Sequence, residues 1–115
     1  MDSALPIINK TYEVYKHFSN LNDHLTKRWR LTLGNSIEAN ILLLIEQFAM
    51  AKNATKTMKT PYLLKASALL ETLNLKLRLI LELKIANETN IFQLQASTQE
   101  IGRMLGGWLK ASLNM

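Results

Sequence analysis

The sequence contains no cysteine, which removes several kinds of chemistry at once. Without a thiol there is no disulfide, no cysteine nucleophile and no cysteine-ligated metal. Helix breakers are also scarce, with two prolines and four glycines among 115 residues. Because leucine, alanine, lysine and glutamate are plentiful instead, the composition favours an all-helical protein.

Long apolar runs are missing as well. The longest, residues 41–45, is far shorter than the roughly 20 residues that a helix needs to cross a bilayer. The N-terminus shows no basic region followed by an apolar stretch, so no signal peptide is expected. The sequence therefore predicts a soluble, cytoplasmic protein without a membrane partner.

Motifs for catalysis and metal binding are absent from the sequence. No Gly-rich phosphate loop, nucleophile elbow or Glu-x-x-His pair occurs. His17 and His24 are seven residues apart, but no third ligand accompanies them at helical spacing, so both are expected on the surface. The acidic residues are scattered singly, which gives no paired-carboxylate site. We expect a non-enzymatic protein without cofactor or metal.

Apolar residues are instead spaced three and four apart in four segments. This pattern predicts helices over residues 5–22, 27–53, 61–86 and 90–112 of a single domain covering 1–115. Thr26 and Thr60 are expected N-caps, and Pro61 suits a first helical turn. Short turns between helices of this kind predict an all-α, antiparallel up-down-up-down four-helix bundle.

The third predicted helix is apolar over more than one side. Leu69, Leu75, Leu79 and Leu83 fall off the stripe that the other apolar residues form. Such a helix is usually covered from two directions, and in a chain with few elements the second cover is expected from outside. The outside surface is either another copy of the chain or a different protein.

The formal net charge of +5 and the pI of about 9.6 suit an anionic partner such as nucleic acid. A solubility margin explains a charge of this size equally well. Residues 27–30 form the densest basic patch, in which Arg28 and Arg30 flank Trp29. Cations beside an aromatic ring are typical of surfaces that bind phosphates and bases.

The last predicted helix holds three glycines within six residues, although each costs about 1 kcal/mol relative to alanine. Gly102 and Gly106 are four apart and share a face, where a neighbouring helix of this or another subunit is expected to approach closely. Trp108 lies on the apolar stripe and is expected in the core, between Arg103 and Lys110 in sequence. Gly34 is a further glycine on a helical pattern.

Three stretches of the chain resemble the accessory variability determinant (Avd) family. They are Leu-Arg-Leu-Ile-Leu-Glu-Leu-Lys over 77–84, Glu-Ile-Gly-Arg-Met-Leu-Gly-Gly-Trp-Leu-Lys over 100–110, and Lys-Arg-Trp-Arg-Leu-Thr-Leu-Gly over 27–34. Thr26 stands where the family usually has a proline, just before the second helix. The last of the four helices carries the most specific part of the match.

This resemblance implies a four-helix bundle that assembles as a ring-like homopentamer. Avd proteins bind the reverse transcriptase of a diversity-generating retroelement and nucleic acid, and they support mutagenic copying of template RNA into cDNA without catalysis of their own. The implied partners are thus the polymerase, RNA, DNA and further copies of the chain. The second resemblance is to the four-helix family encoded within ribosomal RNA intervening sequences, which implies a structural or RNA-binding role.

Two sets of candidate residues follow. The candidates for contact with nucleic acid or polymerase are Lys27, Arg28, Arg30, Lys76, Arg78, Arg103 and Lys110. The candidates for helix packing or assembly are Gly102, Gly106, Gly107, Trp108, Leu69, Leu75, Leu79 and Leu83. Two rival classes stay open, a purely structural oligomer and a small regulatory bundle whose mark would be a buried polar cavity.

Overall fold

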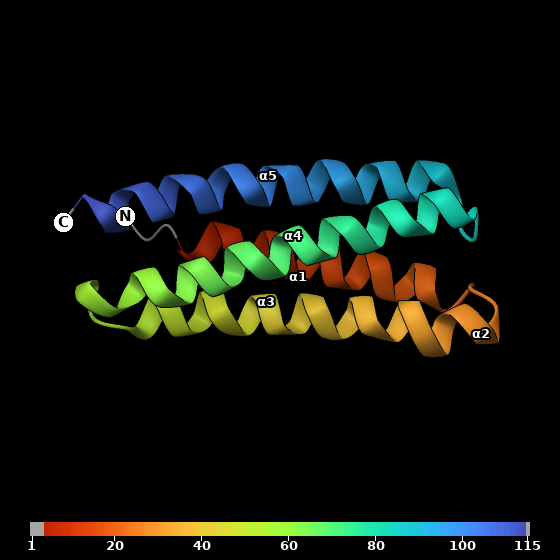
Figure 1. Cartoon of the computed structure of the whole chain (residues 1–115), viewed down its shortest axis with the longest axis horizontal. Helices are drawn as coiled ribbons and strands as arrows, with labels where there is room; N and C mark the ends of the chain where they lie inside the picture. The colour runs from red at the N-terminus through yellow and green to blue at the C-terminus, as the bar shows by residue number, and fades with distance from the viewer. Residues whose placement is uncertain (1–3, 115) are drawn as a thin grey trace.

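Four long helices run along one axis, each antiparallel to the next in the chain (Figure 1). The computed structural model describes residues 4–114. The long helices are α1 (Ala4–Asn22), α3 (Asn35–Asn53), α4 (Lys59–Leu83) and α5 (Glu88–Leu113). Three short segments connect them: α2 (Lys27–Trp29), the π-helical η1 (Arg30–Gly34) and the 3₁₀-helical η2 (Lys56–Met58). The described residues contain no strand, and the expected four-helix architecture is confirmed.

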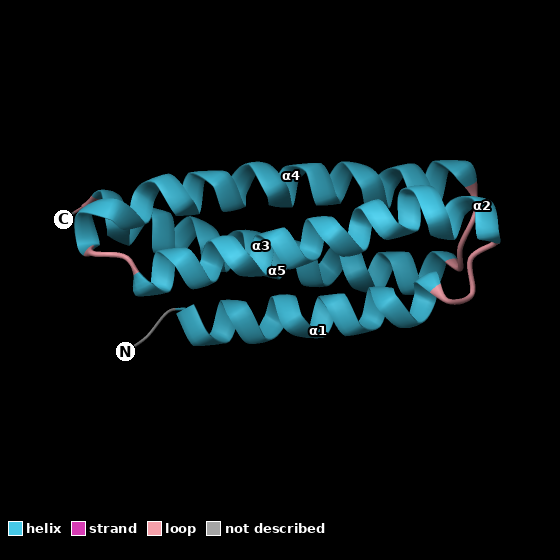
Figure 2. Ribbon diagram, turned by 90° about the horizontal axis from the view of Figure 1, so that it is seen from below, coloured by secondary structure: helices cyan, strands magenta, loops and turns pink. Residues whose placement is uncertain are grey.

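The bundle measures 47 × 21 × 19 Å, and its connections divide it into two different ends. Helix α1 packs beside α3 and α5, and α4 packs beside the same two helices, so α1 and α4 are diagonal (Figure 2). The α1–α3 and α4–α5 connections lie together at what we call the two-turn end (Figure 1). The opposite, one-turn end holds the α3–α4 connection, the start of α1 and the end of α5.

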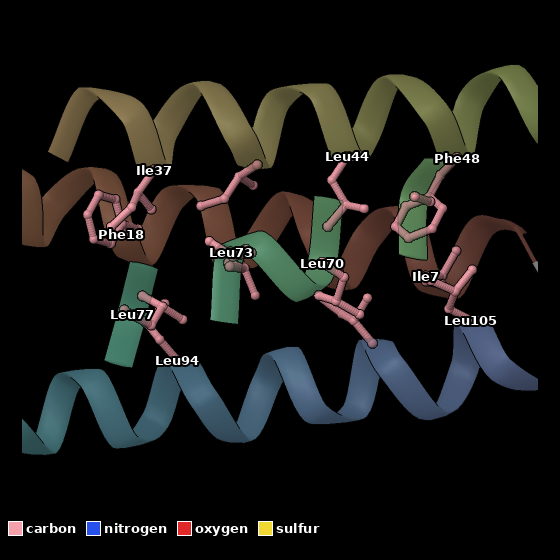
Figure 3. Packing of buried hydrophobic residues seen from close by; sticks show 14 of the residues in the cluster. Ile7, Phe18, Ile37, Leu44, Phe48, Leu70, Leu73, Leu77, Leu94 and Leu105 are labelled. Carbon is pink, nitrogen blue, oxygen red and sulfur yellow. The ribbon is translucent and has the colours of Figure 1, made fainter. Parts of the chain in front are cut away.

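The core is built from the apolar stripes that the spacing predicts. On α4 the buried side chains are Leu63, Ala66, Leu70, Leu73, Leu77 and Ile80. The side chains of Phe18 and Ile37 meet near one end of the core, and those of Phe48, Ile7 and Leu105 near the other (Figure 3). Alternating steps of three and four keep these residues on one face of each helix, which is the pattern of an antiparallel bundle.

The predicted helix over 27–53 is divided into α2, the π-helical η1 and α3, while α1, α4 and α5 begin and end within three residues of the predicted bounds. The caps differ from the predicted ones. Thr26 has the extended backbone of an N-cap, yet its side chain makes no capping hydrogen bond. Thr60 is not a cap, because α4 begins one residue earlier, at Lys59, after the 3₁₀ turn. Asn87 does cap α5, since its Oδ1 accepts from the backbone N–H of Asn90 at 3.1 Å.

Within the described part of the chain, no helix has both the length and the hydrophobicity of a membrane span.

Candidate nucleic-acid interface

The segment Lys27–Arg30 starts the helical run after α1 and lies at the two-turn end. The guanidinium carbon of Arg28 is 4.4 Å from the ring centroid of Trp29, a cation–π contact. The hydroxyl of Thr32 donates to the carbonyl of Arg28 at 2.6 Å. Lys27 and Arg30 form no ion pair with any residue from 4 to 114. These cations are therefore available to an anionic partner, beside a half-buried aromatic ring.

Next to this segment, the side chain of Asn22 at the end of α1 contacts both Gly34 of η1 and Glu38 of α3. Asn22 is only 3% exposed, and its Nδ2 donates to Glu38 Oε2 at 2.9 Å. Its Oδ1 lies against the backbone of Gly34, where a Cβ would be 1.9 Å away. This oxygen has no hydrogen-bond partner within residues 4–114, and the backbone of Gly34 lies against it. Only glycine leaves room for the Asn22 side chain here.

Lys76 serves a structural contact between α3 and α4. Its ammonium group donates to Asn40 Oδ1 at 3.0 Å and reaches the carbonyl of Ser36 at 3.5 Å. Asn40 is itself buried and donates through Nδ2 to the carbonyl of Leu69 at 2.9 Å. Desolvation by burial holds the pKa of Lys76 below its ordinary value. Lys76 is thus tied into the bundle more firmly than the other candidate cations.

Arg78 and Arg103 are both engaged in ion pairs along their own helices. Arg78 Nε is 3.3 Å from Glu82, and Arg103 contacts Glu100. All four side chains are more than two-fifths exposed, and exposed pairs contribute about 1 kcal/mol or less. A phosphate can compete with such a pair, so both arginines stay in the candidate set.

The candidate cations do not form one patch. Lys27, Arg28 and Arg30 lie at the two-turn end, whereas Lys110 lies near the end of α5, at the opposite end. The sequence therefore located several exposed cations but not their grouping. The bundle carries two separate basic regions.

The glycines of α5 differ in their surroundings, because Gly102 lies against Leu70 of α4 whereas Gly106 and Gly107 face open space. A Cβ on Gly102 would meet only Leu70 Cδ2, at an ordinary 3.6 Å, and one on Gly106 or Gly107 would meet nothing within 4 Å. No helix of this chain approaches Gly106 or Gly107 closely, and the approach of another subunit to this face stays a prediction. Trp108 is half-buried rather than enclosed in the core, and it stacks on Phe48, with centroids 6.3 Å apart.

The four leucines off the main stripe divide into two kinds. Leu69 is half-buried and packs against the core, while Leu75, Leu79 and Leu83 are 42–54% exposed. Exposed apolar residues also occur on α3, namely Leu42, Leu43 and Met50. The flanks of α3 and α4 thus offer apolar surface that residues 4–114 do not cover.

A cavity of about 550 Å³ that includes the candidate Arg78 lies between α4 and α5. Its lining residues are Ser67, Leu70, Glu71, Asn74, Leu75, Arg78, Gln95 and Gln99. Most of these are exposed, so the cavity is a surface groove rather than the buried polar chamber of a ligand-binding bundle. A second cavity, of about 560 Å³, includes His17 and His24 at the two-turn end.

The histidines of that cavity form separate hydrogen bonds. His17 Nε2 is 3.2 Å from Asn90 Oδ1, and His24 Nδ1 is 2.9 Å from the carbonyl of Asn20. Among residues 4–114 no group of three histidine, aspartate or glutamate side chains is placed to hold a metal ion.

The bAvd-like family model matches residues 5–112, nearly the whole chain. The chain therefore belongs to the bAvd-like family, whose members are accessory, non-catalytic proteins of retroelements. Comparison with curated proteins and with solved structures gave no match. The family assignment thus agrees with the resemblance found in residues 27–34, 77–84 and 100–110.

Proposed function

We propose that this chain is a non-enzymatic accessory protein of a diversity-generating retroelement. It binds the element's reverse transcriptase together with template RNA and cDNA, and it keeps them in a complex that is competent for mutagenic copying. The observation that carries the proposal is the family match over 5–112, joined to unpaired cations beside Trp29 at the two-turn end.

The chemistry of the Lys27–Arg30 segment fits a single-stranded nucleic acid. Arginine and lysine neutralise phosphates and release counterions, which supplies most of the affinity without reading sequence. An aromatic ring beside them offers a face on which an unpaired base can stack. Trp29 is half-buried, with Arg28 over its ring, so a base can stack there when Arg28 turns to a phosphate.

Reversing the charge at Arg28 and Arg30 should weaken binding to single-stranded RNA and flatten its dependence on salt. Every phosphate that the protein no longer neutralises lowers the slope of log K against log salt by about 0.7 for a single strand. Fluorescence anisotropy of a labelled RNA at several salt concentrations measures both effects for the Arg28→Glu, Arg30→Glu variant.

The Arg28→Lys, Arg30→Lys variant is the matched control, because it keeps the charges and should keep the slope. An unchanged slope in the charge-reversed variant would remove both arginines from the interface. Wild-type binding no stronger than that of a similarly basic control protein would favour the structural-oligomer alternative.

Self-assembly into a ring-like homopentamer is the second part of the proposal. The chain has one flank with exposed apolar residues, on α3 and α4, and a second with small residues, at Gly106 and Gly107 of α5. A ring needs two such lateral faces on every subunit, because each subunit contacts two neighbours.

Replacing Gly106 with leucine should separate bundle packing from assembly. A Cβ at this position meets nothing within 4 Å, so the single bundle should keep its fold and its helical content. If a neighbouring subunit covers this face, the larger side chain should reduce the oligomer mass in light scattering. Gly106→Ala is the control with the smaller side chain.

An oligomer unchanged by Gly106→Leu would place the interface elsewhere, and a wild-type monomer at micromolar concentration would contradict the ring.

The polymerase partner has its own test. A reverse transcriptase gene and a repeated template region should lie beside the gene for this chain, and the two proteins should co-purify when produced together.

A further inference from the structure

The acidic residues of the described chain are confined to two parts of the sequence. All of them lie between Glu13 and Glu46 or between Glu71 and Glu100. The stretches 4–12, 47–70 and 101–114 contain none, but they contain seven basic residues. These are Lys10, Lys52, Lys56, Lys59, Lys65, Arg103 and Lys110. The seven basic residues elsewhere are balanced by eight acidic ones.

The topology brings the acid-free stretches together. They are the first part of α1, the last part of α3, the first part of α4 and the last part of α5, and all four converge on the one-turn end (Figure 1). The positive excess of the described chain is therefore concentrated at this end. The Lys27–Arg30 segment lies at the other end of a 47 Å bundle and cannot be part of the same patch.

Of these seven cations only Arg103 forms an ion pair within residues 4–114, with Glu100. Lys52, Lys56 and Lys110 form no ion pair within residues 4–114. Lys59 is held in place, because its ammonium group donates to the carbonyls of Ala51 at 2.7 Å and Lys52 at 3.2 Å at the end of α3. These are neutral acceptors, so Lys59 adds a fixed positive charge to the surface.

A cavity of about 380 Å³ lies within this end, lined by Lys56, Thr57, Thr60, Ser112 and Leu113. The hydroxyls of Thr60 and Ser112 are hydrogen-bonded to each other across α4 and α5. One of them donates in that bond, which leaves the hydrogen of the other free to donate elsewhere. The cavity thus offers an ammonium group and hydroxyl donors from three segments of the chain.

We propose that the one-turn end binds the phosphate backbone of a single-stranded nucleic acid, with one phosphate group held by Lys56, Thr57 and the Thr60–Ser112 pair. A lysine ammonium is a point charge suited to phosphate, and several single donors arranged around a cavity match tetrahedral oxygens better than a planar carboxylate. The inference rests on the proposed function for the identity of the polyanion, but it concerns a different surface from Lys27–Arg30.

The test compares two double variants that each remove one lysine charge and one threonine hydroxyl. Lys56→Gln with Thr57→Val alters the cavity, and Lys16→Gln with Thr72→Val alters exposed positions in the acid-bearing parts of α1 and α4. Anisotropy with a labelled single-stranded RNA should show Kd about 5- to 10-fold higher for the cavity variant, with a salt slope lower by about 0.7. The control variant should bind like the wild type.

Inorganic phosphate provides a second, independent measurement. In the wild type it should shift the amide NMR signals of residues 55–60 and 112–113, whereas acetate at equal ionic strength should not. These shifts should disappear in the cavity variant.

Four other outcomes of these experiments would overturn the inference. Equal effects of the two double variants would show a non-specific charge effect. Phosphate shifts without a loss of RNA affinity in the cavity variant would show a site for free phosphate only. If the Arg28→Glu, Arg30→Glu variant loses RNA and the cavity variant does not, the one-turn end is excluded while the proposed function stands. A wild type that binds no RNA contradicts both.

Discussion

Replacing Phe48 with alanine should lower the free energy of unfolding by about 3–5 kcal/mol. Phe48 is fully buried on α3 and stacks on Trp108 of α5, so the substitution opens a cavity and removes an aromatic contact. A domain of this size is stable by about 5–15 kcal/mol, so the loss is a large part of the total. Urea unfolding followed by far-UV circular dichroism measures it.

Phe92→Ala is the matched control, because Phe92 is 54% exposed on α5. This substitution should lower the free energy of unfolding much less than Phe48→Ala does. Equal effects of the two alanine substitutions would contradict the observed core. The stack also predicts that Phe48→Ala changes the fluorescence of Trp108 while leaving that of Trp29, at the other end, unchanged. Single-tryptophan backgrounds separate the two signals.

Replacing Gly34 with alanine should destabilise the bundle by about 1–3 kcal/mol. The new methyl group would lie 1.9 Å from Oδ1 and 2.7 Å from Cγ of Asn22, which has no room to retreat because it is 3% exposed. Asn22 would have to turn away from Glu38, and this would break the hydrogen bond that joins α1 to the start of α3. Thermal unfolding of the single variant measures the cost.

The clash predicts a strong coupling between the two positions. In a double-mutant cycle, Asn22→Ala should remove most of the penalty of Gly34→Ala, because the atoms that collide are gone. Gly107→Ala is the control, since its Cβ meets nothing within 4 Å and alanine favours a helix by up to about 1 kcal/mol. Additive effects of Asn22→Ala and Gly34→Ala would show that the tight contact is absent in solution.

The helices were predictable because their apolar spacing is regular over many turns. The stripe from Leu63 to Ile80, for example, fixes the buried face of α4 without reference to the other helices. Caps were less predictable, since they depend on single residues. Thr60 has the right chemistry and is followed by proline, but the 3₁₀ turn at Lys56–Met58 begins the helix before it.

The sequence identifies the candidate cations one by one, but it does not predict which of them lie on the same surface. The sequence does not predict the hydrogen bond between Lys76 and Asn40, because the two residues belong to different helices. Gly34 is recognisable as a glycine in a helix, but the sequence does not indicate that Asn22, twelve residues earlier, requires it. The acid-free stretches are visible in the sequence, and only the bundle topology shows that they meet at one end.

The unequal ends of the bundle also define a direction. If the proposed ring forms with its bundles along the rotation axis, every bundle points the same way and all the one-turn ends gather on one rim. Such a ring has two chemically different faces, one carrying the lysines of the one-turn end of every copy and the other carrying Lys27–Arg30 of every copy. Mutual repulsion on the lysine rim would oppose closure of the ring, and salt or a bound polyanion would relieve it. Assembly of the proposed ring would then depend on the bound polyanion.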